Sequence, residues 1–182
     1  MSQNLSAPVP SEEAGAISGP ATDPAEIAIA CARRMWEEDK ASQALGMSLI
    51  EITPGSALMS MTVRSDMANG HGMCHGGFMF LLADSAFAFA CNSHNQRAVA
   101  AGAEIHFVSP AKIGDVLTAQ ASEQHRAGRS GFYDVRVTDQ NGELIALFRG
   151  RSATIKGHLV EVSERNSPGA DRKSPGDTAI HR

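Results

Sequence analysis

The stretch of sequence from Asn69 to Ser93, NGHGMCHGGFMFLLADSAFAFACNS, decides the fold of this 182-residue chain. Its first nine residues include four glycines and show no regular pattern of apolar positions, which is typical of a loop. From Phe78 to Asn92 the residues are apolar on nearly every side, and a helix without a polar face is buried inside its protein. The stretch therefore predicts an irregular loop that leads into a buried helix.

Residues on both sides of this helix alternate between apolar and polar as β-strands do. Before it, 47–52 and 57–63 read as two strands joined by the turn residues Thr53-Pro54-Gly55-Ser56. Four more strands follow the helix, at 99–108, 116–125, 130–138 and 143–155. Asn141-Gly142 is a strong hairpin signal, and strands do not alternate with helices, so we expect an antiparallel meander. The predicted fold class is α+β, with a sheet of five to six strands wrapped around a long central helix.

The two ends of the chain differ in composition from its middle. Residues 1–22 and 159–182 are rich in Ser, Ala, Pro and Gly, so we expect two disordered tails. Asp23 can cap a helix whose first position suits Pro24, and we expect this single amphipathic helix to end near Gly46. One domain is thus predicted for residues 23–158.

Composition limits the class of partner and the compartment. The formal net charge is -4, so the chain lacks the overall basic field that favours binding to nucleic acid or anionic membranes. Three cysteines at unrelated spacings do not indicate a disulfide framework. The most apolar run, 78–91, is too short to span a membrane and contains Asp84. We therefore expect a cytoplasmic protein that binds neither nucleic acid nor membrane.

Asp84 is the residue of the predicted helix that is hardest to explain by structure alone. Its neighbours, among them Leu82, Ala83 and Ala86, are apolar, and burial of a carboxylate is costly unless it is paired. A carboxylate in such a position is a candidate for catalysis. Alternatively, Asp84 lies on a wet edge of the helix or bonds a neighbouring backbone donor. The pattern alone leaves both interpretations open.

Gly76 and Gly77 precede the helix and are candidates for binding an oxyanion. Without side chains they let a ligand atom approach the free N–H groups of the first turn, where the helix dipole favours negative charge. Alternatively, they only form a tight turn into the helix. Asp84 follows Gly77 by seven residues, which is about 10 Å along one helix. If both act on one carbonyl, the carboxylate must come from a second, antiparallel helix, which a two-fold dimer supplies.

The loop before the helix carries four polar residues, Asn69, His71, Cys74 and His75. His-x-x-Cys-His could bind a metal, but adjacent Cys and His rarely ligate one ion and no second ligand pair follows. Cys74 and His75 could also act as nucleophile and base, although sequence neighbours usually point apart. Asn69 suits a left-handed turn before Gly70. We therefore predict no metal site in the loop.

The stretch from Asn69 to Ser93 closely resembles the PaaI-type (phenylacetate-degradation) thioesterases of the hotdog-fold superfamily. The resemblance covers about residues 40–157 and continues through IHFVSPAK at 105–112, GD at 114–115, YDV at 133–135 and ALFRGR at 146–151. It implies a hotdog fold, in which a sheet curls around the central helix. It also implies dimers that pair through their sheets and usually stack into tetramers, and hydrolysis of acyl-CoA thioesters without a metal or redox cofactor.

The same resemblance implies a role for each candidate residue. By motif position, Asp84 resembles the family's catalytic carboxylate, which acts as general base or nucleophile. Gly76 and Gly77 resemble the helix-start donors that polarise the thioester carbonyl. Asn69 and His75 resemble the loop residues that position the thioester and the attacking water. The implied substrate is phenylacetyl-CoA, a ring-hydroxylated form of it, or another aromatic or medium-length acyl-CoA.

One difference from the family lies on the strand after the helix. Some relatives carry Ser or Thr there, whereas this chain has Ala100 and Ala101, so water positioning relies more on Asn69 and Asp84. Glu104 on the same strand is interpreted as an outward-facing residue rather than a second catalytic acid.

Two other functions fit the pattern. A hydratase or dehydratase of acyl thioesters would use His75 with a partner acid. A non-catalytic acyl-CoA binding module would use the same groove without turnover, but it has little reason to keep Asp84. Lys112, Arg149 and Arg151 could meet CoA phosphates, although we interpret each as solvated surface charge.

Overall fold

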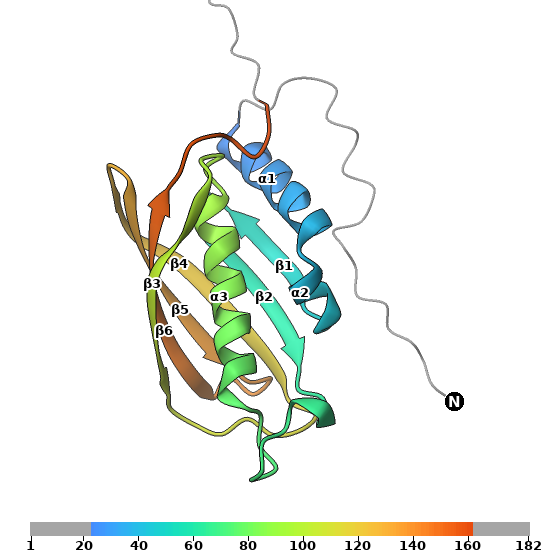
Figure 1. Ribbon diagram of the computed structural model, residues 1–182. Coiled ribbons are helices and arrows are strands. Elements are labelled where there is room, and N and C mark those ends of the chain that lie inside the picture. Colours follow the sequence, from blue (N-terminus) through green and yellow to red (C-terminus); the bar gives the residue numbers. More distant parts are fainter. Residues whose placement is uncertain (1–22, 162–182) are drawn as a thin grey trace, which may run out of the picture.

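Helix α3 (Gly76–Asn92) lies in the concave face of a six-stranded sheet, as Figure 1 shows for the computed structural model of the chain. The structure describes residues 23–161. The strands are β1 (Ser48–Thr53), β2 (Ser56–Thr62), β3 (Ala98–Phe107), β4 (Val116–Ala127), β5 (Ser130–Thr138) and β6 (Leu144–Thr154). All neighbouring strands are antiparallel. The predicted α+β class, with a sheet wrapped around one central helix, is confirmed.

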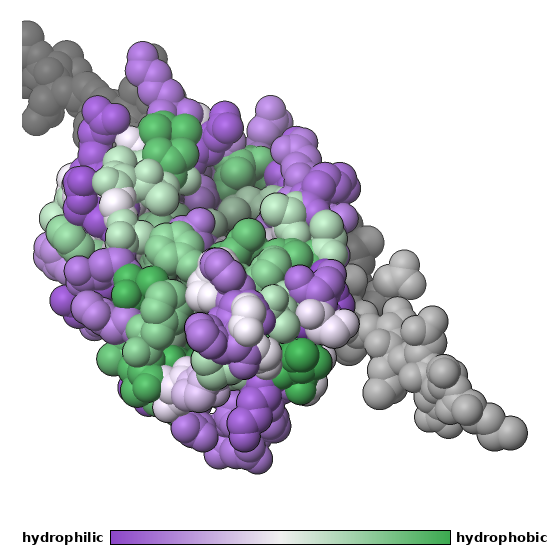
Figure 2. Space-filling model, turned by 60° about the horizontal axis from the view of Figure 1, so that its bottom comes forward, coloured by the Kyte–Doolittle hydropathy of each residue, from purple (hydrophilic) through white to green (hydrophobic). Residues whose placement is uncertain are grey.

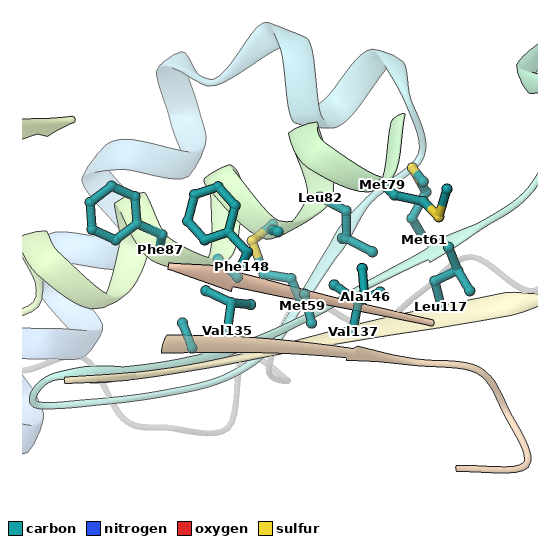
Figure 3. Packing of buried hydrophobic residues seen from close by; sticks show 14 of the residues in the cluster. Met59, Met61, Met79, Leu82, Phe87, Leu117, Val135, Val137, Ala146 and Phe148 are labelled. Atoms are coloured by element: carbon teal, nitrogen blue, oxygen red, sulfur yellow. The ribbon is translucent and has the colours of Figure 1, made fainter. Parts of the chain in front are cut away.

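The hydrophobic core fills the space between α3 and the sheet. Phe87 packs against Tyr133 of β5 and Phe148 of β6, with ring centroids 5.4 and 5.9 Å apart. Leu82 of α3 and Met59 of β2 are fully buried between the two layers (Figure 3). Each large side chain buried in this way contributes about 1.5–3 kcal/mol. Nine of the 17 residues of α3 are buried, which confirms the predicted buried helix.

Two helices precede the sheet where one is predicted. Asp23 caps α1 (Pro24–Glu38) as expected. Asp39 then interrupts the helix and caps α2 (Lys40–Ala44), because its side chain accepts a hydrogen bond from Ser42 N at 3.0 Å. When the oxygen of a short side chain accepts a hydrogen bond from a nearby backbone N–H group, that bond competes with continuation of the helix. The prediction of a single helix over this segment is therefore wrong.

The strands follow the order β1-β2-β4-β5-β6-β3 across the sheet. The hairpin β1–β2 and the successive pairs β4–β5 and β5–β6 form as predicted. β3 and β4 are consecutive in the chain but do not pair: β3 joins β6, and β4 joins β2. The chain crosses the sheet through α3 and begins β3 at the far edge (Figure 1). The predicted meander of four strands is therefore wrong for its first pair, β3 and β4.

β3 forms a long edge of the sheet. It has ten residues, pairs with β6 on one side, and has no strand on its other side within residues 23–161. Its apolar residues Val99 and Phe107 are 47% and 54% exposed, and most of its other residues are Ala or Gly. A long, apolar and uncovered edge strand is a template for pairing with another chain.

Asn95 ties the end of the described chain to the helices. Its Oδ1 accepts hydrogen bonds from Leu159 N and Val160 N, both at 3.0 Å, and from Cys31 Sγ of α1 at 3.6 Å. These contacts run two residues past the predicted domain end at 158. Apart from residues 159–161, the predicted tails lie outside the described residues. No helix in this part of the chain is long and apolar enough to cross a membrane.

Candidate active site

The first turn of α3 has one occupied and one open backbone N–H group. His75 is the N-cap residue, and its Nδ1 accepts a hydrogen bond from Gly77 N at 3.0 Å. Phe78 N donates to His75 O at 3.0 Å. Across residues 23–161, no acceptor bonds the N–H group of Gly76. Of the two glycines predicted to bind an oxyanion, Gly76 therefore offers the free donor at the positive end of the helix, whereas Gly77 donates to His75.

Gly76 lies directly against the ring of Phe107 at the end of β3. A Cβ atom added at Gly76 would lie 2.8 Å from Phe107 Cζ, which is closer than two carbon atoms can approach without a shift. Phe107, Val108 and Ile113 are all at least half exposed. Figure 2 shows apolar patches among hydrophilic residues on this side of the molecule. A side chain at position 76 would therefore have to displace the exposed ring of Phe107.

Asn69 organises the loop that precedes α3. Its Oδ1 accepts hydrogen bonds from His71 N at 2.9 Å and Met73 N at 3.3 Å. Its own backbone N–H donates to Met73 O at 2.7 Å. The left-handed residue of the loop is Gly72, with a φ of 74°, and Asn69 does not adopt this conformation. The interpretation of Asn69 as a left-handed turn residue is therefore wrong, and the residue acts through its side-chain oxygen.

Cys74 and His75 do not form a nucleophile and base. Cys74 is 2% exposed, and burial raises the pKa of its thiol. The ring of His75 is exposed and caps α3 through Nδ1. Within the described residues, no three His, Cys, Asp or Glu side chains are grouped as metal ligands. All three cysteines are free and buried, which agrees with the absence of a disulfide framework, while a cytoplasmic location stays a prediction.

Asp84 lies in the middle of α3 and is half-buried. Nothing within residues 23–161 donates a hydrogen bond to its carboxylate, whereas the adjacent Ser85 Oγ lies 2.9 Å from Ser42 Oγ of α2. Burial raises the pKa of Asp84 because desolvation disfavours the charged carboxylate. Burial, and then the charge of Asp84, raise the pKa of Cys91 to about 12. The interpretation that Asp84 accepts a bond from a neighbouring backbone group is therefore wrong.

The two candidate groups are separated within one subunit. α3 runs without interruption from Gly76 to Asn92, so Asp84 lies eight residues, or about 12 Å along the helix axis, beyond the open N–H group of Gly76. One helix therefore does not bring the carboxylate and the donor to the same carbonyl group. The two groups can act on one carbonyl only if a second helix supplies one of them.

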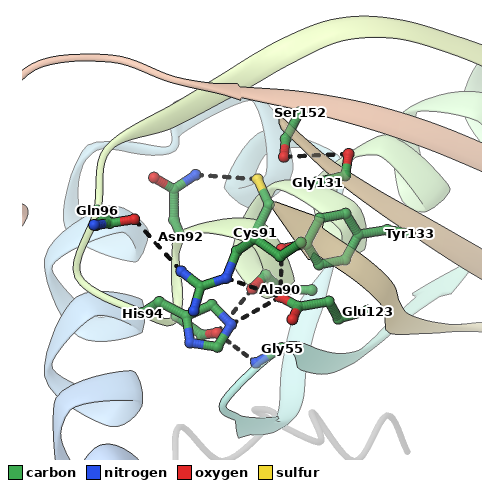
Figure 4. Close-up of polar contacts among 12 residues, drawn as sticks. Gly55, Ala90, Cys91, Asn92, His94, Gln96, Glu123, Gly131, Tyr133 and Ser152 are labelled. Atoms are coloured by element: carbon green, nitrogen blue, oxygen red, sulfur yellow. Dashed lines mark hydrogen bonds and ion pairs between the residues drawn. The ribbon is translucent and has the colours of Figure 1, made fainter. Parts of the chain in front are cut away.

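A polar cluster that the sequence does not reveal lies at the other end of α3 (Figure 4). The Glu123 carboxylate accepts a hydrogen bond from Tyr133 OH at 2.7 Å and lies 2.8 Å from His94 Nε2 and 3.8 Å from Arg126 Nε. Partial burial alone would raise the pKa of Glu123, but these bonds and the charges of His94 and Arg126 together lower it. Glu123 faces Tyr133 in the register of β4 and β5, and only that register could have located the pair. We assign the cluster a structural role.

Glu104 lies on the outer face of the sheet, away from α3. It is paired in register with Arg149 of β6, and both line a groove of about 490 Å³ formed by β3, β4, β5 and β6. Arg149 donates two hydrogen bonds to Asp134, of 2.6 and 2.9 Å. Arg151 donates to Ala101 O at 3.0 Å. Glu104 thus faces outward as predicted, and both arginines are engaged on the molecule itself.

Known proteins are similar to this chain in sequence and in structure. The thioesterase superfamily model matches residues 71–146. The acyl-coenzyme A thioesterase PaaI of Escherichia coli is 45% identical over 129 residues, which are 71% of this chain and 92% of that protein. The acyl-coenzyme A thioesterase 13 of Homo sapiens is 31% identical to this chain over 105 residues, which are 55% of this chain and 74% of that protein.

A solved structure of the E. coli PaaI protein superimposes with a TM-score of 0.74 and 43% identity, and the match covers 75% of this chain and 99% of that one. Identity at this level across nearly the whole length of the relative, together with the shared sheet and central helix, establishes the family. The chain belongs to the PaaI-type acyl-CoA thioesterases of the hotdog-fold thioesterase superfamily.

Proposed function

We propose that this protein hydrolyses aromatic or medium-length acyl-CoA thioesters, such as phenylacetyl-CoA and its ring-hydroxylated forms, to the free acid and CoA. The observation that carries the proposal is Asp84, a half-buried carboxylate for which residues 23–161 supply no hydrogen-bond donor. Burial of an unpaired carboxylate lowers the stability of the fold, so such a group is expected at a reaction centre rather than at a position with only a structural role. The substrate class is taken from the E. coli relative, which is described as a protein of the phenylacetic acid degradation operon.

The proposed active site lies between two subunits. Two copies of β3 can pair edge to edge about a two-fold axis, which extends the sheet and lays two α3 helices side by side on one face. The helices then run antiparallel, so Asp84 of the partner subunit comes close to Gly76. The same pairing covers the exposed Val99 and Phe107 of each edge.

The proposed reaction uses side-chain and backbone groups alone. Gly76 N–H donates a hydrogen bond to the thioester carbonyl oxygen, and Asp84 of the partner subunit accepts a proton from water as the water oxygen attacks the carbonyl carbon. The oxyanion that forms is stabilised by the fixed donor, an effect worth about 3 kcal/mol. The C–S bond then breaks, and the proton passes from Asp84 to the CoA thiolate. In the alternative route, Asp84 attacks the carbonyl carbon itself, and water hydrolyses the resulting anhydride.

Asn69 and His75 are proposed to position the thioester and the attacking water. The Oδ1 of Asn69 is engaged by its own loop, so its Nδ2 is the group that can reach a substrate or water. The Nδ1 of His75 accepts from Gly77, which places the proton of the neutral ring on Nε2 and makes that atom a donor. Both donors belong to the loop that leads into α3.

We also propose that the dimers stack into tetramers through the outer face of the sheet. Phe132 and Leu147 are 42% and 38% exposed there, beside the groove that contains Glu104 and Arg149. Apolar groups together with charges of both signs suit contact with a second copy of the same face.

A hydratase or dehydratase on this fold is less well supported. Such an enzyme would need a histidine oriented by an acid, but His75 is oriented by the backbone of Gly77. No carboxylate within the described residues forms an ion pair with it.

Release of free CoA from phenylacetyl-CoA, its ring-hydroxylated forms and straight-chain acyl-CoA thioesters tests the proposal. We expect Asp84→Asn to lower kcat by about 10²–10⁴-fold, the usual contribution of a general base. Glu26→Gln on the exposed face of α1 is the matched control and should retain the wild-type rate. Equal rates for Asp84→Asn and the control would refute the role of Asp84. CoA-ester binding without turnover by the wild type would instead favour a binding module.

A further inference from the structure

We propose that Arg64 positions the active-site loop, because its side chain joins the base of that loop to the end of α2. The active-site loop is the segment 68–75, which carries Asn69 and His75 and leads into α3. This inference rests on the thioester hydrolysis proposed above. It adds a positioning residue whose side-chain hydrogen bonds go to Asp66 and Leu45 and not to the proposed reaction centre.

Arg64 lies between the end of β2 and the short 3-10 helix η1 (Ser65–Met67). Its Nε and Nη2 each donate to a different carboxylate oxygen of Asp66, both at 3.0 Å. Its Nη1 donates to Leu45 O at 2.8 Å. We call these three bonds the Arg64 clamp. Because the guanidinium group is planar and rigid, one side chain holds η1 and the end of α2 in a fixed relation.

The end of α2 is a firm attachment point for the clamp. Leu45 is the C-cap residue, and Gly46 after it ends the helix in the left-handed conformation, with a φ of 68°. Carbonyl groups at the end of a helix lack partners within it and attract a cation. α2 is in turn joined to α3, since Ser42 Oγ lies 2.9 Å from Ser85 Oγ. Figure 1 shows α2 beside the end of β2, where the clamp lies.

η1 forms the base of the active-site loop. Met67 N donates to Arg64 O at 3.1 Å, and the Met67 side chain is fully buried in the core. Met67 O in turn accepts a hydrogen bond from His75 N at 2.9 Å. His75 is the N-cap residue of α3 and directly precedes Gly76. A shift of η1 therefore reaches the open N–H group of Gly76 through a single hydrogen bond and one residue.

The clamp is exposed, so it should matter more for geometry than for stability. The side chains of Arg64 and Asp66 are 40% and 66% exposed, and exposed ion pairs contribute little to the free energy of unfolding. The hydrogen bonds from Arg64 lower the pKa of Asp66, which keeps the carboxylate charged. Reaction rates are more sensitive, because misplacement of a group by about 1 Å can slow a reaction about 100-fold. Loss of the clamp should therefore slow turnover without a matching loss of stability.

Steady-state hydrolysis of phenylacetyl-CoA by Arg64→Gln, Arg64→Lys and Asp66→Asn tests the clamp. We expect Arg64→Gln to lower kcat about fivefold, because the helix-start donor is displaced by a fraction of an ångström. KM should change less than about twofold, and Tm should fall by less than about 2 °C. Arg64→Lys should recover only part of kcat, because an ammonium group cannot contact Asp66 and Leu45 as the planar fork does.

A double variant shows whether the two side chains act through one contact. Asp66→Asn should lower kcat about twofold, and Arg64→Gln/Asp66→Asn should be no slower than Arg64→Gln alone. The matched control is Arg34→Gln/Glu38→Gln, which removes an ion pair of similar exposure from α1 and should keep the wild-type kcat. A wild-type kcat in Arg64→Gln, or an equal loss in the control, would overturn the positioning role.

Hydrogen–deuterium exchange measured by mass spectrometry tests the clamp without any substrate. We expect peptides that cover residues 65–77 to exchange at least about threefold faster in Arg64→Gln than in the wild type, because the loop opens locally. Peptides from β5, residues 130–138, should exchange at the wild-type rate. Unchanged exchange over 65–77 would overturn the clamp even if kcat falls. If the wild type hydrolyses no CoA thioester, the proposed function fails, and the exchange result still decides whether Arg64 holds the loop.

Discussion

At the scale of single residues, Asp84 opposes the stability of the fold that contains it. Burial raises the folded-state pKa of Asp84 above its unfolded value, so the folded protein binds this proton more tightly than the unfolded chain does. Its contribution to stability is therefore largest at low pH. That contribution is lost as the pH rises from the ordinary Asp value through the raised one, and at neutral pH the ionised carboxylate destabilises the protein.

The substitution Asp84→Asn should stabilise the protein while it lowers kcat. We expect a gain of about 0.5–1 kcal/mol at neutral pH, or a rise in Tm of about 2 °C, because the neutral amide avoids the cost of a half-buried charge. Thermal melts at pH 4 and pH 7 check this, and the gain should shrink at the lower pH. A loss of stability at pH 7 would mean that the assembled protein pairs this carboxylate.

Asn69 combines a loop role with a proposed positioning role, and two substitutions separate them. Asn69→Asp keeps an oxygen for His71 N and Met73 N, whereas Asn69→Ala leaves both without an acceptor and should cost about 1 kcal/mol. We expect the Asp variant to retain the wild-type Tm but to lose about tenfold in kcat, because it lacks the Nδ2 donor. Full kcat in the Asp variant, measured by CoA release, would leave Asn69 with its loop role alone.

At the scale of elements, the start of α3 has little space for a side chain, because the ring of Phe107 lies against Gly76. Gly76→Ala should lower kcat/KM by about 10²-fold, because the new methyl group must displace either the Phe107 ring or the first turn that holds the donor. Phe107→Ala in the same chain removes the clash and should recover part of the loss. Steady-state kinetics with circular dichroism melts check both variants. A Gly76→Ala enzyme with the wild-type rate would contradict the proposed donor.

Most elements could be predicted from local sequence, and those that could not depend on distant or competing contacts. The turn residues around Gly55 and Asn141-Gly142 act within a few positions, so both hairpins follow from the sequence. Asp39 could not be identified as a helix break, because its capping bond competes with a helix that the apolar spacing also favours. The pairing of β3 with β6 depends on where α3 carries the chain. The alternation of apolar and polar residues within a strand does not indicate which strand is its neighbour.

At the scale of the whole molecule, the candidate site could be predicted in its residues but not in its geometry. The sequence indicates Asp84 and the Gly76-Gly77 pair, because an isolated carboxylate and two glycines stand out from an apolar helix. It does not indicate that Gly77 is already bonded to His75, since that depends on a side-chain rotamer. The seven-residue spacing between Gly77 and Asp84 can also be read from the sequence, and it supports the proposed site between two subunits.

The free edge of the sheet allows a direct test of that shared site. Gly102→Lys, near the middle of β3, has space for a side chain and places a charge of the kind that blocks strand pairing in natural sheets. We expect it to shift the protein towards monomer in analytical ultracentrifugation and to lower kcat/KM at least tenfold. Ile50→Lys, 51% exposed on the opposite edge strand β1, is the matched control. A monomeric Gly102→Lys protein with full activity would contradict a site built from two subunits.

The strand order also determines when the protein can fold during its synthesis. β6 lies between β5 and β3, yet it is the last strand to leave the ribosome, after β3 has already been made. Until residues 144–154 emerge, β3 has no strand to pair with, and one edge of β5 is open as well. Both are then exposed to other nascent chains, as is typical of folds with distant strand pairing. Ribosomal pausing or truncation just before Leu144 should therefore favour aggregation more than pausing after Thr154.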